Sequence, residues 1–235
     1  MSLSPERAQL LRQIRAEVAD LIGDGVQFVP TPVRAAAPAA ASVSAAEVDA
    51  SALAAVREEL GDCRRCTLCQ GRTQIVFGEG NPEPRVVFVG EGPGAEEDRT
   101  GRPFVGPAGE LLTRMIEACG WKRSEVYICN IVKCRPPGNR DPEPDEVEAC
   151  RPFLERQLRA LAPEVIVTLG RPATSALLGR SVSITQLRGR WQQWREIPLM
   201  PTFHPAYVLR NYTLQTRQQV WDDLRAVHAR LAQRG

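Results

Sequence analysis

The sequence lacks a long apolar run, a secretory signal and a strong net charge. No stretch approaches the roughly 18–20 uncharged apolar residues that span a bilayer, and charged side chains interrupt residues 1–22. We therefore expect no membrane segment and a cytoplasmic protein. The formal net charge is only +2, so attraction to nucleic acid would have to come from local basic patches and not from the whole molecule.

Cysteine, by contrast, occurs seven times. The cytosol keeps thiols reduced, so these residues indicate metal ligation more than a disulfide framework. Cys63 and Cys66 form a CxxC pair, and Cys134 and Cys150 could converge on the same centre in the fold. Spacing alone leaves structural zinc, an iron–sulfur cluster and no metal as open alternatives. The cysteines without an assigned partner are Cys69, Cys119 and Cys129.

Apolar spacing divides the chain into three parts. Residues 1–29 have the spacing of a helical segment, residues 30–46 form an Ala/Pro-rich linker, and residues 47–235 form the body. In the body, short apolar runs alternate with amphipathic segments, which is typical of a parallel sheet covered by helices on both faces. We predict an α/β fold, a three-layer α/β/α sandwich with a short central parallel sheet, plus an N-terminal helical extension.

The positions of the expected elements follow from the same pattern. The predicted strands are residues 86–90, 126–132, 165–170 and 197–202. The predicted helices are residues 46–60, 108–119, 145–161, 171–178 and 216–232. Ligands of such sheets bind outside the carboxyl ends of the strands, and three polar or glycine-rich loops leave those ends, at residues 91–102, 133–140 and 203–211.

The loop sequences carry a resemblance to a known family. Gly90-Glu-Gly-Pro-Gly-Ala-Glu-Glu-Asp98 lets the backbone approach a ligand closely. A phosphate-binding loop is the alternative, but both GxGxxG and Gly-Lys-Ser/Thr are missing. Together with the motifs of residues 100–109, 133–140 and 202–210, the sequence from Cys63 to about Ala232 resembles the iron–sulfur uracil-DNA glycosylases of family four.

The resemblance implies a function, a cofactor and partners. It implies an enzyme that flips uracil out of DNA and hydrolyses its N-glycosidic bond, releasing free uracil and leaving an abasic site for base excision repair. It also implies a 4Fe-4S cluster on Cys63, Cys66, Cys134 and Cys150. The expected partner is uracil-containing DNA, single- or double-stranded, bound by a monomer at the nucleoid. Residues 1–46 are the expected attachment for a protein partner.

The resemblance also implies a set of base-binding residues: Glu91, Gly92, Pro93, Glu97, Phe104, Asn130 and His204. Phe104 would stack on the extruded base, and Glu97 would fill the space beside its C5 atom. Asn130 would present its amide oxygen to N3–H and its amide N–H to O4, a pairing that the amino group of cytosine would disrupt. A Phe104 that only fills the core is the structural alternative.

Catalysis also requires a group that stabilises the departing uracil and a group that holds the attacking water, and the sequence offers candidates for both. Bond cleavage leaves negative charge on the O2 atom of uracil, which His204 and the backbone N–H groups at Glu91–Gly92 could stabilise. A structural loop histidine is the alternative for His204. The best-known uracil glycosylases hold the attacking water with an Asp, but this chain has Gly92 at that position. Glu91 is the first candidate to hold the water, and Asn139 is the second.

DNA contacts are expected from two loops. Lys133, Arg135 and Arg140 lie in a proline-rich loop that the cluster would hold rigid against phosphates. Residues 207–210 would form a loop pressed into the minor groove, with Val208 or Leu209 as a wedge. The expected contacts in this second loop are Tyr207, Val208, Leu209 and Arg210.

Two competing functions would each require different residues. A related class traps uracil-DNA covalently through a histidine in an arginine-rich loop, but no histidine lies between Cys134 and Cys150. A non-catalytic DNA-binding module or polymerase accessory would need no base-reading pocket. The complete set of base-reading candidates disfavours it, namely Glu91, Phe104, Asn130 and His204.

Overall fold

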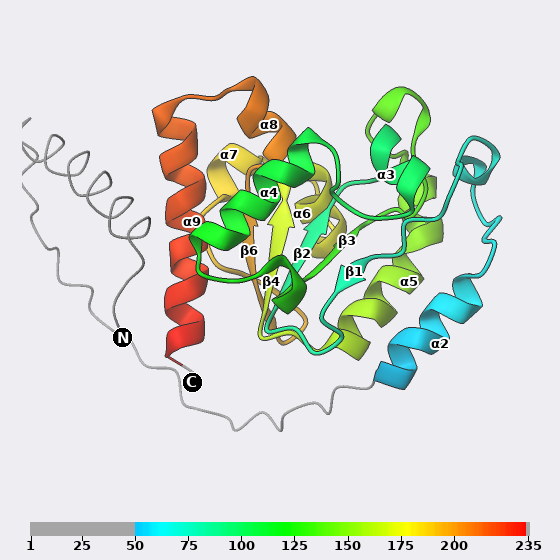
Figure 1. Cartoon of the computed structure of the whole chain (residues 1–235), viewed down its shortest axis with the longest axis horizontal. Helices are drawn as coiled ribbons and strands as arrows, with labels where there is room; N and C mark the ends of the chain where they lie inside the picture. Colours follow the sequence, from blue (N-terminus) through cyan, green and yellow to red (C-terminus); the bar gives the residue numbers. More distant parts are fainter. Residues whose placement is uncertain (1–49, 234–235) are drawn as a thin grey trace, which may run out of the picture. The chain divides into compact units, whose positions relative to one another are not determined.

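Within residues 50–233, which the computed structural model describes, six strands form one sheet in the order β1-β3-β2-β4-β6-β5 (Figure 1). These residues belong to the unit Ala45–Gly235. The strands are β1 Glu79–Gly80, β2 Val86–Gly90, β3 Tyr127–Asn130, β4 Val165–Leu169, β5 Gln192–Trp194 and β6 Ile197–Thr202. The helices are α2 Ala50–Leu60, α3 Ala95–Thr100, α4 Pro107–Ala118, α5 Pro144–Leu161, α6 Gly170–Leu178, α7 Ile184–Leu187, α8 Pro205–Arg210 and α9 Leu214–Ala232.

The centre of the sheet is parallel, and its two edges are antiparallel. Strands β3, β2, β4 and β6 run in the same direction, and every residue of β2 and β4 is buried. Such near-continuous Val- and Ile-rich strands are typical of a sheet covered on both faces. The edge strands β1 and β5 pair antiparallel with β3 and β6. With two and three residues, they are too short to give a periodic signal in the sequence.

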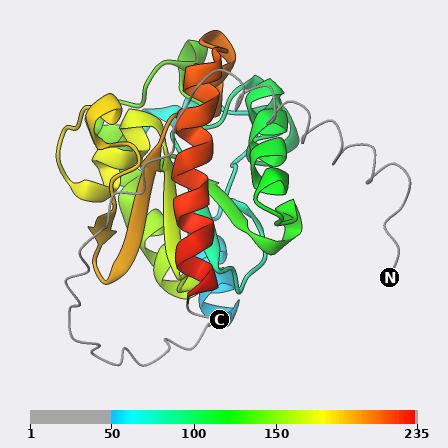
Figure 2. The same cartoon turned by 90° about the vertical axis from the view of Figure 1, so that its left-hand side faces the viewer.

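Alternate residues of each strand point to opposite faces of the sheet, which creates two separate cores. On one face, Val86 and Phe88 of β2 pack with α4 and α9. On the other face, Val87 and Val89 pack with α5 and α6. Figure 2 shows α9 lying across the first face beside α4. The predicted three-layer α/β/α sandwich is confirmed.

The outer helices begin where the sequence supplies helix-start signals. Pro107 and Pro144 stand at the first helical positions of α4 and α5, where the missing N–H removes no helical hydrogen bond. Glu146 closes a capping box on α5 by accepting a hydrogen bond from the Glu143 N–H at 2.7 Å. Helix α2 packs against α5 through a third cluster that includes Val56 and Phe153.

Two of the three predicted loops contain short helices. Helix α3 lies in the loop predicted over residues 91–102, and α8 lies in the loop predicted over residues 203–211. The third loop contains a 3₁₀ turn at Pro137–Asn139. No helix in residues 50–233 is both long enough and apolar enough to cross a membrane. The predicted N-terminal helical segment and the Ala/Pro-rich linker lie outside the described residues.

Candidate active site

A cavity of about 660 Å³ opens at the carboxyl ends of the parallel strands. Gly90 and Asn130 end two paired strands, and Leu169 and Thr202 end two others, so four chain segments leave the sheet at this edge. The loops after β2, β3 and β6 and the start of α6 line the cavity. All seven predicted base-binding residues lie on its wall, namely Glu91, Gly92, Pro93, Glu97, Phe104, Asn130 and His204.

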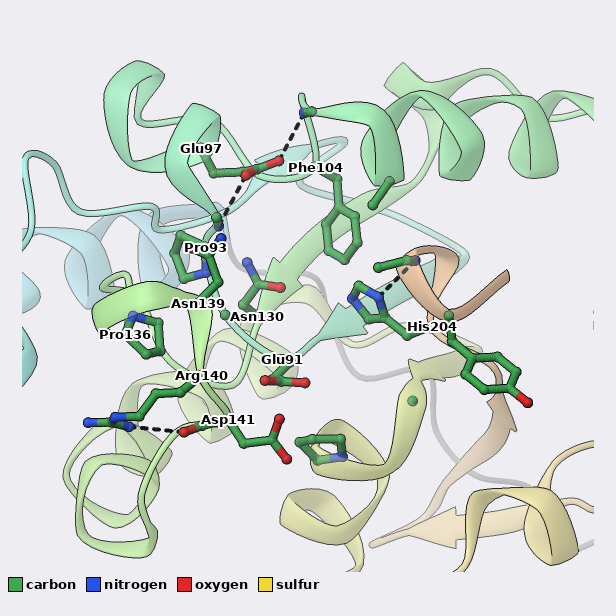
Figure 3. A pocket seen from close by; sticks show the side chains of 18 of the residues that line it. Glu91, Pro93, Glu97, Phe104, Asn130, Pro136, Asn139, Arg140, Asp141 and His204 are labelled. Carbon is green, nitrogen blue, oxygen red and sulfur yellow. Dashed lines mark hydrogen bonds between the residues drawn. The ribbon is translucent and has the colours of Figure 1, made fainter. Parts of the chain in front are cut away.

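Asn130 forms the floor of this cavity (Figure 3). The residue is only 1% exposed, and its Oδ1 atom has no hydrogen-bond partner within the described part of the chain. A buried amide oxygen without a partner is costly, since desolvating it is uncompensated. A ligand group that donates a hydrogen bond would satisfy it. Gly90 makes room for this arrangement, because a Cβ atom there would lie 2.5 Å from both Asn130 Oδ1 and the Phe104 ring.

Phe104 and His204 face the cavity beside one another (Figure 3). Their ring centroids are 5.6 Å apart, with the rings inclined at 35°. Phe104 has a φ of 52°, a left-handed conformation that is uncommon for a residue other than glycine. Backbone strain of this kind persists where the surrounding structure holds it, and it often marks a binding site.

His204 is held in one tautomer by the backbone of the short helix α8. Its Nδ1 atom accepts a hydrogen bond from the Ala206 N–H at 3.1 Å. Burial and, to a smaller extent, the charge of Arg210 lower the pKa of His204 to about 4. The imidazole is therefore neutral at neutral pH, and with Nδ1 acting as acceptor its single proton lies on Nε2, free to donate to a ligand.

Glu91 follows β2 directly and places its carboxyl group in the cavity (Figure 3). Burial raises the pKa of Glu91 to about 7, and the neighbouring carboxylate of Asp141 raises it as well. Arg171 and Arg210 act in the opposite direction. A carboxyl group poised near neutral pH suits acid–base chemistry.

Glu97 stabilises the rim of the cavity. One carboxylate oxygen accepts hydrogen bonds from the N–H groups of Val105 at 2.9 Å and Gly106 at 3.0 Å. The other accepts from the Gly94 N–H at 3.1 Å. These bonds connect the loop before α3 to the loop before α4, so the structure gives Glu97 a bracing contact besides its place on the cavity wall.

The loop after β3 contributes Asn139 and Arg140 to the cavity, but both are also engaged within the loop. Asn139 Oδ1 accepts a hydrogen bond from Arg135 Nε at 2.8 Å. Arg140 binds both carboxylate oxygens of Glu146, at 2.9 and 2.7 Å. The 3₁₀ turn is thus fixed from both sides by its own arginines.

The prediction that Lys133 contacts DNA is wrong. Its side chain is 1% exposed, and Nζ donates to the backbone carbonyl of Asn130 at 2.8 Å and lies 6.0 Å from the centre of the Phe77 ring. An ammonium group enclosed in this way cannot reach a phosphate. The sequence gives the charge of a lysine but not the direction of its side chain.

The predicted minor-groove loop is the helix α8, and its side chains point in different directions. Val208 is 3% exposed and packs in the core with α4, so it cannot act as a wedge. Tyr207 and Leu209 are each 37% exposed, and Tyr207 and Arg210 line the cavity mouth. The helical turn explains the difference, because residue 208 faces inward while its neighbours face solvent.

The four predicted ligand cysteines lie around one small second cavity. Cys63, Cys66, Cys134 and Cys150 all line it, whereas Cys69 does not. Cys119 and Cys129 are buried in the two cores, one on each face of the sheet. Burial raises the pKa of the Cys150 thiol to about 11, so a thiolate there requires nearby positive charge.

Positive side chains do approach these sulfur atoms. Arg72 Nη1 donates to Cys134 Sγ at 3.3 Å and to the Cys63 carbonyl at 2.6 Å, and Arg65 donates to Cys63 Sγ at 3.4 Å. Within residues 50–233, no three His, Cys, Asp or Glu side chains lie close enough to hold a single metal ion. The donor set is four cysteine side chains around one cavity, which is the composition of a four-thiolate zinc site and of an iron–sulfur cluster.

Three polar residues that the sequence did not single out belong to these sites. Asp141 and Arg171 line the large cavity, and Arg72 lines the cysteine cavity. Asp141 directly follows the predicted proline-rich loop, and this position is the one sequence feature that could have identified it as a site residue. Arg171 and Arg72 stand outside the quoted motifs.

Comparisons with known proteins agree with this geometry. A family model described as the uracil DNA glycosylase superfamily matches residues 77–225. The chain is 51% identical over 171 residues to a type-4 uracil-DNA glycosylase of Thermotoga maritima, covering 72% of this chain and 89% of that protein. It is 49% identical over 169 residues to one of Sulfurisphaera tokodaii, covering 68% and 77%. A type-5 uracil-DNA glycosylase of Pyrobaculum aerophilum is 35% identical over 114 residues, covering 42% and 50%.

Proposed function

The chain belongs to the uracil-DNA glycosylase superfamily, and on that premise we propose that it removes uracil from DNA in base excision repair. It hydrolyses the N-glycosidic bond, releases free uracil and leaves an abasic site. The single observation that carries the proposal is the buried amide oxygen of Asn130 on the floor of the large cavity, which has no hydrogen-bond partner among residues 50–233. A protein that only bound the DNA backbone would have no use for a buried group of this kind.

Recognition of the base depends on Asn130 and Phe104. Asn130 Oδ1 accepts the N3–H of uracil and its amide nitrogen donates to O4, whereas cytosine lacks that N–H and presents an amino group. Stacking on Phe104 contributes about 1–3 kcal/mol, which offsets part of the cost of flipping the base out. Both side chains lie on the same cavity wall, in agreement with this pairing.

Departure of uracil depends on His204. Cleavage places negative charge on the O2 atom, and the neutral imidazole donates its Nε2–H to that atom. The hydrogen bond from Ala206 to Nδ1 supports this role, since it keeps the proton on the opposite nitrogen. The backbone N–H groups at Glu91–Gly92, on the cavity wall, are a second source of donors.

Glu91 positions the attacking water, and Asn139 is its alternative. The pKa of about 7 lets Glu91 accept a proton from that water at the upper end of the neutral range. The amide oxygen of Asn139 is already occupied by Arg135, which favours Glu91. If Glu91→Gln keeps the full single-turnover excision rate across the pH range, the role of Glu91 is excluded.

The four cysteines Cys63, Cys66, Cys134 and Cys150 hold a 4Fe-4S cluster. Its contribution would be structural, because it would join Cys134 in the loop after β3 to Cys150 in α5. The backbone N–H of Lys133 donates to the Cys150 sulfur and thereby connects this site to the end of β3. Iron and acid-labile sulfide in a brown protein support this assignment, whereas a colourless protein with stoichiometric zinc contradicts it.

DNA contacts come from the exposed residues around the cavity mouth. Tyr207, Leu209 and Arg210 of α8 are exposed, and Tyr207 and Arg210 line the cavity. Arg135 and Arg140 of the loop after β3 are half-buried and are the second set of contacts. Leu209 takes the place of the expelled base in the stack. We expect a monomer to bind in this way, because a base-flipping site needs access to DNA from one face only.

The function is tested with uracil-containing oligonucleotides, single- and double-stranded, followed by treatment with alkali. Strand scission at the uracil position is the expected result, with Asn130→Ala as the variant that loses it. A heat-stable protein–DNA adduct would assign the chain to the covalent class instead. A mobility shift without scission would contradict the glycosylase proposal.

Residues 1–46 provide the attachment for a protein partner. They are rich in Ala and Pro, a composition typical of a tether. A pull-down with the whole chain and with a chain that begins near Ala46 tests this, and equal capture by both contradicts it. Repair of DNA also requires that the protein reach the nucleoid, which agrees with the expected cytoplasmic location.

A further inference from the structure

A second carboxyl group lies against Glu91. The side chain of Asp141, from the loop that precedes α5, is within hydrogen-bonding reach of the Glu91 carboxyl group. Figure 3 shows the two groups facing one another across the cavity wall. Two carboxyl groups in contact cannot both be ionised without strong repulsion, so one proton is retained between them.

The surroundings decide which of the two keeps the proton. Arg171 Nη2 lies 2.6 Å from Asp141 Oδ2, so the guanidinium group is paired directly with the Asp141 side chain. Glu91 is more deeply enclosed, and burial favours its neutral form. The charged groups facing Glu91 are Asp141 before α5, Arg171 on α6 and Arg210 on α8. The proton therefore resides on Glu91 and is hydrogen-bonded to Asp141.

We propose that Asp141 is a positioning residue for the glycosylase reaction, which holds a proton on Glu91 and so sets the pH at which Glu91 can serve the attacking water. The inference rests on the proposed function. It adds a residue that controls excision without touching uracil, and it explains why an exposed aspartate lies at the mouth of a cavity beside an arginine.

The reaction balances with these groups. Water oxygen forms a bond to C1′ of the deoxyribose, the C1′–N1 bond breaks, and its electron pair leaves with uracil. The proton of the water passes to the Glu91 carboxylate, which must have lost its own proton first. Excision therefore requires ionised Glu91 and rises with pH through the range near 7 where that group titrates.

The test is the pH profile of single-turnover excision in Asp141→Asn. Removing the negative charge favours ionised Glu91, so the midpoint of the profile moves down by about one pH unit. Below both midpoints, the rate relative to the high-pH plateau then rises about tenfold. Asp141→Glu keeps the charge and restores the midpoint of the unsubstituted protein.

Arg171→Gln is the matched variant of opposite sign, because Arg171 favours ionised Glu91, and its midpoint moves to higher pH. Asp145→Asn removes an exposed carboxylate four residues along the chain, outside the cavity, and leaves the midpoint where it was. If Arg171→Gln changed the melting temperature but not the midpoint of the pH profile, the ion pair between Asp141 and Arg171 would be only structural.

The outcomes separate the inference from the function. An unshifted midpoint in Asp141→Asn, in a protein that excises uracil, overturns the role of Asp141 and leaves the proposed function intact. Absence of excision by the unsubstituted protein at every pH overturns the proposed function, and this inference with it. A downward shift in Asp141→Asn together with an upward shift in Arg171→Gln supports both.

Discussion

Two loops leave neighbouring strands at the same edge of the sheet, yet they use their polar groups differently. The loop after β2 directs Glu91 into the cavity and keeps the floor open with Gly90. The loop after β3 turns its basic side chains inward, to the Asn130 carbonyl, to Asn139 and to Glu146. The first loop forms the reacting surface, and the second is chiefly a rigid support.

This difference teaches that a basic sequence is not the same as a basic surface. Lys133, Arg135 and Arg140 look alike in the sequence, but one is fully buried and the other two hold a 3₁₀ turn in place. The side chains best placed for phosphate contact come from α8 instead. Four predictions test this division between the two loops and the segments around them.

The largest effect is expected at the cavity floor. Asn130→Ala removes a pair of hydrogen bonds to uracil, which together contribute about 3 kcal/mol, or about 100-fold in single-turnover excision. The melting temperature should change little, since Oδ1 bonds to nothing in the described chain. A large loss of stability without a loss of rate would place Asn130 among the structural residues.

Salt dependence distinguishes a surface cation from a buried one. Arg210→Gln weakens DNA binding and reduces the slope of log affinity against log salt by about one, because one phosphate contact is lost. Lys133→Met removes the same charge from the supporting loop and leaves the slope unchanged. The comparison between the loops fails if Lys133→Met lowers the slope as much as Arg210→Gln does.

A smaller effect, on stability, is expected for the supporting loop. Arg140→Gln breaks the bidentate pair with Glu146, whose side chain is 1% exposed. The arginine holds the pKa of Glu146 below its usual range, so its loss also weakens the resistance of the loop to acid. Thermal melting should show a drop of a few degrees, and Arg114→Gln on α4 serves as the control.

At neutral pH the smallest effect on stability is expected at His204, and this effect grows as the pH falls. The pKa of His204 in the folded protein is about 4, against 6.5 ordinarily, so the unfolded chain binds more protons between these values. Stability from this group is complete above pH 6.5 and is lost as the pH falls to 4. His204→Gln removes that slope, and His228→Gln, at the other histidine, retains it. Melting curves across this range measure both.

Much of the fold was predictable, because long buried strands and amphipathic helices have distinct periods. Strand β2 occurs at its predicted residues, 86–90, and α5 and α9 differ from their predictions only at their first residues. The short edge strands and the six-residue helices α3 and α8 were missed. Their sequences are too short for periodicity, and Gly and Pro around them are equally typical of loops.

The sequence predicted those site residues whose positions follow from the order and direction of the strands. Glu91, Asn130 and His204 meet because each follows or ends a parallel strand, which the alternating pattern indicates. The sequence did not predict that the side chains of Lys133 and Val208 point inward, because this depends on which side of each turn faces the core. Asp141 escaped prediction for the same reason, since only the folded loop brings its carboxyl group to Glu91.

The hydrogen bond that fixes His204 has a consequence for mutational tolerance. Its donor is the main chain of Ala206, and every amino acid except proline carries that N–H. Other side chains at position 206 therefore leave the tautomer of His204 unchanged. A catalytic histidine oriented by a carboxylate, in contrast, depends on an Asp or Glu at one particular position. The position of the proton on Nε2 therefore does not depend on the side chain at position 206, and Ala206→Pro is the substitution that removes the N–H donor.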